Sequence, residues 1–159
     1  MEGDSLIQNP KDFSEKNYLP LSALHSMMKR LIFPENFSKE EQFHLSTADR
    51  EFLLNTMKIL PKEAGYDPKT YYDGYVKFFL LGDSKEDMPD YIEIYNKVGY
   101  AYGYLTDCAY IKNKKTNREF IITGTIHVNE NQIFNDDNYQ YEAIGIPFLA
   151  ELGRQLVLK

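Results

Sequence analysis

Residues 92–128, which read IEIYNKVGYAYGYLTDCAYIKNKKTNREFIITGTIHV, decide the fold. Apolar and polar side chains alternate over 92–98, which is the two-residue period of a β-strand. Two further runs, 104–111 and 119–128, are rich in the β-branched and aromatic residues that strands favour. A polar loop at 112–117 separates these two runs. Three consecutive strands with short connections predict an antiparallel meander.

Helical periodicity surrounds this sheet on both sides. Ser22 and Ser46 are candidate N-caps, and Asp49 stands at the reciprocal position of a capping box with Ser46. We therefore expect an α+β fold in a single domain, 1–159, with a helical region followed by the meander and a closing helix. Its parts are a lead-in (1–20), a helical region (21–90), antiparallel strands (91–128), a polar excursion (129–138) and a C-terminal helix (139–158). The expected helices are Ala23–Ile32, the segment from Ser46 to Leu60, Tyr71–Leu81 and Tyr139–Leu158.

Composition excludes several classes of function. The 159 residues include 18 basic and 24 acidic side chains, which gives a formal net charge of −6. Such a chain is a poor candidate for non-specific nucleic-acid binding, and it lacks a basic face for anionic lipid. No apolar run approaches the roughly 20 residues that span a bilayer. Residues 1–10 lack the basic-then-apolar pattern of a signal peptide.

The cysteine and histidine content points to neither a disulfide framework nor a metal site. Cys108 is the single cysteine, so no internal disulfide can form. His25, His44 and His127 do not have the spacing of metal ligands. We therefore predict no cofactor.

The aromatic residues are unevenly distributed. The chain has 13 tyrosines and 10 phenylalanines but no tryptophan, and 12 of the tyrosines lie between Tyr66 and Tyr141. Tyrosine combines a large apolar ring with a polar tip, which suits sheet faces and cleft walls. The second half of the chain is therefore expected to contain the sheet and any cleft.

Two short motifs carry candidate chemistry. In Asn96-Lys97-Val98-Gly99, a strand lysine can present its ammonium group to a cleft, and the glycine lets a ligand approach the backbone. The plainer interpretation is an edge-strand lysine beside a bulge glycine. Ser26-Met27-Met28-Lys29 matches Ser-x-x-Lys, but it lies in the middle of an expected helix, and a chance match is the favoured interpretation.

The order of these elements resembles the C-terminal part of the serine β-lactamase and penicillin-binding-protein superfamily, nearest the class A β-lactamase-like serine hydrolases. Lys97-Val98-Gly99 occupies the place of the family's Lys-Thr/Ser-Gly motif on a sheet-edge strand. Asp107 looks like the family's aspartate on the next strand. The resemblance covers most of 18–158 and is closest to bacterial members described only as serine hydrolases.

The resemblance implies roles for four residues. Lys97 would bind the substrate carboxylate, Gly99 would let the substrate lie against the strand, and the backbone N–H of Tyr100 would be an oxyanion donor. Val98 would line the substrate site, but it lacks the hydroxyl that Thr or Ser offers there. The implied substrate is a small-molecule amide or ester in a parent protein that is secreted or periplasmic.

The family's nucleophile motif is missing from its expected place. The Ser-x-x-Lys helix, the Ser-x-Asn loop and the omega-loop glutamate all precede the helical region, so they would lie upstream of Met1. We therefore expect a truncated domain that is inactive alone and self-associates through an exposed sheet edge. Two alternatives are a non-catalytic binding module with a tyrosine-lined sheet face and an autonomous enzyme that uses Ser26 and Lys29.

Overall fold

The computed structural model describes residues 5–159 of the chain. Residues 1–4 lie outside the described residues. They belong to the expected lead-in and to the stretch 1–10 that was compared with a signal peptide. Residues 5–20 contain turns and bends but no helix. The elements that follow are α1 (Leu21–Ile32), η1 (Pro34–Asn36), α2 (Thr47–Lys58), α3 (Phe78–Leu81), β1 (Ile92–Ala101), β2 (Tyr104–Asn113), β3 (Arg118–His127), η2 (Tyr141–Gly145) and α4 (Ile146–Val157).

The predicted meander is confirmed. The three strands form an antiparallel sheet in the order β1-β2-β3, with Ile92 opposite Asn113 and Tyr104 opposite His127. β1 continues to Ala101, beyond the alternating pattern, because its last residues still pair with β2 as far as the turn at Tyr102 and Gly103. β1 and β3 are the edges of the sheet.

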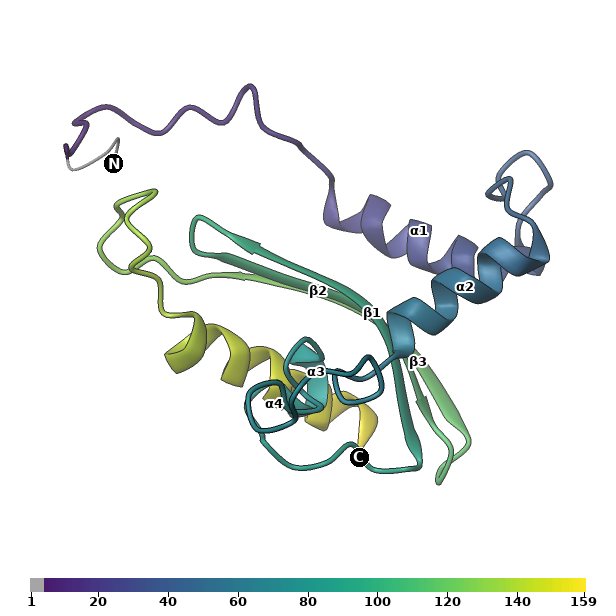
Figure 1. Cartoon of the computed structure of the whole chain (residues 1–159). Helices are drawn as coiled ribbons and strands as arrows, with labels where there is room; N and C mark the ends of the chain where they lie inside the picture. The colour runs from purple at the N-terminus through teal and green to yellow at the C-terminus, as the bar shows by residue number, and fades with distance from the viewer. Residues whose placement is uncertain (1–4) are drawn as a thin grey trace.

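Helices cover both faces of the sheet (Figure 1). α1 and α2 lie over one face, and α3 and α4 pack together beneath the other. Side chains alternate along each strand, so each strand contributes to both layers. The fold is thus α+β, as predicted, with the sheet as its central layer.

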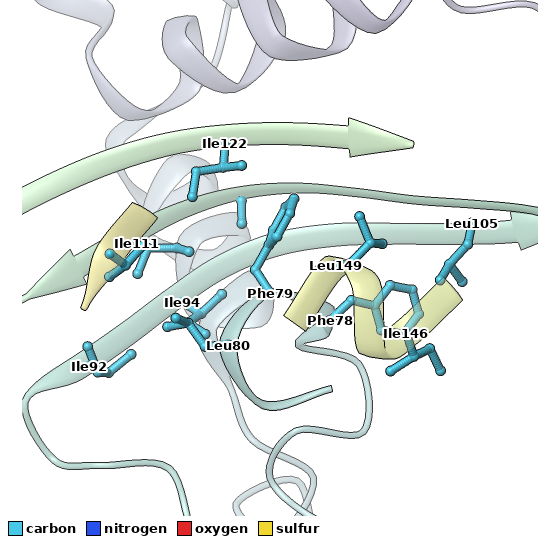
Figure 2. Close-up of a cluster of buried hydrophobic side chains, with 12 residues drawn as sticks. Phe78, Phe79, Leu80, Ile92, Ile94, Leu105, Ile111, Ile122, Ile146 and Leu149 are labelled. Atoms are coloured by element: carbon cyan, nitrogen blue, oxygen red, sulfur yellow. The ribbon is translucent and has the colours of Figure 1, made fainter. Parts of the chain in front are cut away.

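The larger core lies between the sheet and the α3–α4 layer. Phe79 and Leu149 are completely buried there, and Figure 2 shows Phe79 rising from its turn toward the strands. The other fully packed members of this cluster are Phe78, Leu80, Ile92, Ile94, Leu105, Ala109, Ile111, Ile122, Ile146 and Val157. A smaller core on the opposite face joins Met28 and Ile32 of α1 to Cys108 and Tyr110 of β2.

The N-termini of the first two long helices differ from each other. The predicted capping box of α2 is confirmed, since Ser46 Oγ accepts the backbone N–H of Asp49 and the Asp49 carboxylate accepts the backbone N–H of Ser46. The predicted cap at Ser22 is wrong, because α1 begins at Leu21 and follows Pro20 without a side-chain cap. Proline cannot continue a hydrogen-bonded turn but is tolerated at a helix start, so it marks the boundary.

The predicted helix over Tyr71–Leu81 is also wrong. Turns occupy most of this segment, and even its short helical part has non-helical backbone at Phe79 and Leu80, where φ of Leu80 is +76°. A side chain at Gly74 would lie 2.0 Å from the carbonyl oxygen of Leu81, so the chain folds closely back on itself. The free energy gained by burying the large side chains of this segment against the sheet outweighs the helical preference that their spacing indicates.

The predicted C-terminal helix over Tyr139–Leu158 is shorter and composite. It begins with the π-helical turn η2 and continues as α4, with Pro147 in the first turn of α4. Gly153 of α4 faces the Phe79–Leu80 turn, where an added Cβ would lie 2.7 Å from the backbone nitrogen of Leu80. The next residue, Arg154, donates to the Leu80 carbonyl at 2.8 Å. α4 therefore holds the strained turn in place.

None of the helices among residues 5–159 is both long enough and apolar enough to cross a membrane.

Substitution of Gly153 tests the packing of α4 on the turn. Gly153→Ala should lower the free energy of unfolding by about 1–3 kcal/mol, because the added methyl group meets backbone that must move. Gly99→Ala is the matched control, since an added Cβ there has no neighbour within 4 Å. Gly99→Ala should leave the free energy unchanged or raise it by up to about 1 kcal/mol. Urea denaturation measures both; equal effects would contradict the close packing at Gly153.

Candidate functional site

A cleft of about 470 Å³ lies at the β1 edge of the sheet. Three parts of the chain form its walls: the C-terminal end of α2, the irregular segment 59–77, and the middle of β1. The lining residues are Thr56, Met57, Ile59, Leu60, Pro61, Ala64, Tyr66, Tyr71, Tyr75, Val76, Lys77, Asn96, Lys97 and Val98. The cleft is mostly apolar with a few converging polar groups, which is the usual character of a small-molecule site.

A row of tyrosine rings forms one wall of the cleft. The ring centroids of Tyr66 and Tyr71 are 5.3 Å apart, and those of Tyr71 and Tyr75 are 4.9 Å apart in an edge-to-face arrangement. The buried carboxylate of Asp73 anchors this segment, since it accepts from Lys62 Nζ at 2.8 Å and from the backbone N–H of Met88 at 2.7 Å. The wall is therefore held by ring packing and by a hydrogen-bonded buried charge.

A buried polar network adjoins the cleft, which two of its residues, Lys77 and Asn96, line. Lys77 Nζ donates to Asn96 Oδ1 at 2.8 Å and to the backbone carbonyl of Met57 at 2.6 Å. Asn96 Nδ2 donates to both carboxylate oxygens of Asp107, at 3.0 and 3.2 Å, and to the carbonyl of Val76 at 2.8 Å. Lys77, Asn96 and Asp107 are at most 7% exposed, so their polar groups are satisfied by one another and by backbone.

Burial perturbs both ionisable groups of this network. It lowers the pKa of Lys77 to about 8, although the nearby Asp107 carboxylate opposes the shift. It raises the pKa of Asp107 to about 7, against the hydrogen bonds from Asn96 and from the backbone N–H of Phe79. Perturbed groups beside a cleft are typical of functional sites, although buried structural networks have the same property.

The four residues predicted from the Lys-Val-Gly motif are consecutive on β1 but lie in different surroundings. Lys97 and Val98 line the cleft. The Lys97 ammonium group is exposed and donates to the carbonyl of Val98 at 2.7 Å. Gly99 has open space around its α-carbon, and Tyr100 is 61% exposed with its ring against Tyr141 at 5.2 Å.

The Ser-x-x-Lys match lies elsewhere. Ser26 is on α1 and does not line the cleft; its hydroxyl accepts from Arg30 at 2.6 Å, and Lys29 is exposed. His25 of the same helix bonds to Thr123 Oγ1 at 2.9 Å. No group of three or more His, Cys, Asp or Glu side chains among residues 5–159 is placed to hold a metal ion.

Sequence reasoning missed Lys77 and assigned no functional part to Asn96. The signal for Lys77 was its place directly before the apolar run Phe78–Leu81. A lysine that is buried together with such a run needs hydrogen-bond partners, because an unpaired buried charge is costly. Asp107 was noted only through the family resemblance. Val98 lies opposite Asp107 in the sheet register, and Asn96 is two residues before Val98 on the same face of β1. The side chains of Asn96 and Asp107 therefore meet on one face of the sheet.

The cleft has a local charge opposite to that of the whole chain. Its charged lining residues are Lys77 and Lys97, and no carboxylate from residues 5–159 lines it. The chain as a whole carries −6. The two lysines give the lining a positive charge at the β1 edge, and this lining, drawn from the described part of the chain, includes no serine, cysteine or histidine.

No protein-family model matches the chain, and no match appears among curated proteins or solved structures.

The raised pKa of Asp107 predicts a specific pH dependence of stability. In the folded state the pKa of Asp107 is about 7, so the side chain keeps its proton up to about that pH. In the unfolded state the pKa has its ordinary value of 3.8, so the side chain loses its proton at a lower pH. The free energy of unfolding contributed by this residue should therefore fall as pH rises from about 4 to about 7. Asp107→Asn should remove this slope.

Urea denaturation at several pH values measures this contribution as the difference between wild type and Asp107→Asn. Asp90→Asn, which changes an exposed carboxylate, is the matched control and should show a much smaller pH-dependent difference. A constant difference between wild type and Asp107→Asn across this pH range would contradict the raised pKa.

Proposed function

We propose that residues 1–159 are the C-terminal portion of a β-lactamase-like serine hydrolase. The observation that carries the proposal is the position of Lys97 and Val98, the first two residues of the Lys-x-Gly pattern. Both lie on the edge strand β1 and line the cleft, whose charged lining residues are lysines. The meander, the closing helix and the helices on the opposite face accord with the order of elements that suggested the family.

In this proposal the chain supplies the substrate-binding strand of an acyl-transfer site. Lys97 attracts the carboxylate of an amide or ester substrate, and the open space at Gly99 lets the substrate approach the backbone. The backbone N–H of Tyr100 acts as an oxyanion donor. Val98 offers no hydroxyl, so substrates other than penicillins are favoured. The serine nucleophile comes from a preceding segment that this chain does not include.

The proposal predicts that the chain acquires activity only with that segment. The transcript upstream of the Met1 codon should encode Ser-x-x-Lys and then Ser-x-Asn in frame. The chain alone should show no sustained turnover of nitrocefin or a p-nitrophenyl ester. Co-expressed with the upstream segment, it should hydrolyse one of them, and Lys97→Ala should lower kcat/KM by about 10²–10³-fold because a fixed charge in the cleft is lost.

Lys29→Ala is the matched control, because Lys29 is an exposed lysine on α1 outside the cleft. An upstream frame without these motifs would contradict the proposal. Sustained turnover by the chain alone would contradict its inactivity. If a fluorophosphonate probe labelled the chain and Ser26→Ala abolished the labelling, the autonomous enzyme would be supported instead.

The second candidate is a non-catalytic binding module. The wall formed by Tyr66, Tyr71 and Tyr75 favours it, because tyrosine provides large contact areas with few rotatable bonds. The tyrosines on the sheet do not form one continuous surface: Tyr95 and Tyr110 pack beside α1 and α2, whereas Tyr100 is exposed near the hairpin turn. A binding module would therefore use the cleft, and ligand binding without turnover in the co-expressed protein would favour it.

The proposal also predicts self-association of the isolated chain. β1 and β3 are edge strands of ten residues each, and neither pairs with a further strand in the described part of the chain. Unpaired backbone groups along such edges favour addition of another strand. Multi-angle light scattering across a concentration series should show dimers or larger species. A stable monomer at all concentrations would count against a truncated sheet.

A further inference from the structure

A second and smaller cavity, of about 90 Å³, adjoins the cleft. Tyr75 and Val76 line both spaces, so they form the partition between them. Three separate parts of the chain bring tyrosines to the smaller cavity: the irregular segment before α3, the end of β1, and η2. The lining residues are Tyr72, Tyr75, Val76, Phe78, Tyr100, Leu105, Tyr141, Glu142 and Ile146.

The tyrosine rings of this cavity form two edge-to-face pairs. The centroids of Tyr72 and Tyr75 are 6.0 Å apart with planes at 85°, and those of Tyr100 and Tyr141 are 5.2 Å apart at 71°. Two of the rings are also anchored through their hydroxyl groups. Tyr72 Oη donates to the carbonyl of Gly82 at 3.2 Å, and Tyr141 Oη accepts the backbone N–H of Gly103 at 2.8 Å. The rings are therefore held in position without a ligand.

The charge around this cavity is negative, in contrast to that of the cleft. Glu142 is its single charged lining residue, it is exposed, and it makes no ion pair within residues 5–159. Burial raises the pKa of Tyr72, and the charges of Glu142 and Asp83 add to this increase. The Asp83 carboxylate is already paired with Arg154, whereas Glu142 has no cationic partner among residues 5–159.

We propose that the four tyrosines and Glu142 form an aromatic cage that binds an organic ammonium group. The faces of tyrosine rings attract cations through their quadrupoles, and aromatic cages of this kind recognise quaternary and methylated ammonium groups. The unpaired carboxylate of Glu142 adds attraction for a positive charge and none for a neutral ligand. A cavity of about 90 Å³ fits a small headgroup rather than a whole polymer segment.

The cage goes beyond the proposed hydrolase function and does not depend on it. The cage consists of the rings and the carboxylate of the smaller cavity, whereas the proposed hydrolase site uses Lys97 in the cleft. Because Tyr75 separates the two spaces, an ammonium group in the cage lies beside any ligand in the cleft. A binding experiment without turnover therefore tests the cage separately.

Isothermal titration calorimetry with choline tests the cage on the full chain. The matched ligand is 3,3-dimethylbutan-1-ol, which has the shape of choline but carries a carbon in place of the charged nitrogen. We expect saturable binding of choline and at least tenfold weaker binding of the neutral alcohol, because the shape is kept and the charge is lost. Equal affinities, or no saturable binding of choline, would overturn the proposal.

Three substitutions locate the binding. Tyr100→Leu should weaken choline binding by about three- to tenfold, whereas Tyr100→Phe should retain it, because a benzene ring keeps the attractive face. Glu142→Gln should weaken it by about two- to fivefold, because an exposed carboxylate contributes modestly. Tyr66→Leu is the control, since Tyr66 lines only the cleft.

Tyr66, Tyr100 and Glu142 are all exposed, so far-UV circular dichroism should be unchanged in every variant. Weakening by Tyr66→Leu equal to that by Tyr100→Leu would place choline in the cleft and overturn the cage. Unchanged binding in both Tyr100→Leu and Glu142→Gln would overturn it as well.

Discussion

The hydrogen-bonded contact between Asn96 and Asp107 is the interaction on which the rest of the structure depends. A buried carboxylate must be hydrogen-bonded or neutral, and Asn96 meets this need by donating to both of its oxygens. The same amide donates to the Val76 carbonyl and accepts from Lys77, which in turn reaches the end of α2. One polar contact inside the sheet thus connects β1, β2, the irregular segment and a helix of the opposite layer.

This contact also explains where the cleft lies. Segment 71–81 cannot form a helix and still place Lys77 and the Phe79 ring against the sheet, so it passes the β1 edge as a series of turns. The turns leave space between α2 and β1, and the tyrosines of the segment line that space. Two lysines then face one cavity, while Glu142 faces the neighbouring one. The two cavities differ in charge although they share a wall.

Sequence patterns were reliable where one local interaction dominates. Alternation over 92–98 predicted β1, and the spacing of Ser46 and Asp49 predicted the start of α2. Patterns failed at Tyr71–Leu81, where helical spacing of aromatic residues competes with burial on the sheet. Lys97 and Val98 of the motif line a cleft, but the polar network behind them and the second cavity join residues too far apart in the chain for spacing to reveal.

The sequence by itself determined the order of the three strands, the start of α2, the acidic charge, and the placement of lysine and glycine on a strand, because each depends on near neighbours or on composition. Only the tertiary structure decided that Lys77 is buried, that Asn96 joins it to Asp107, and that tyrosines from three elements surround Glu142. These features depend on desolvation and on the meeting of distant segments. Both are properties of the packed chain, since neither exists until the sheet is covered on its two faces.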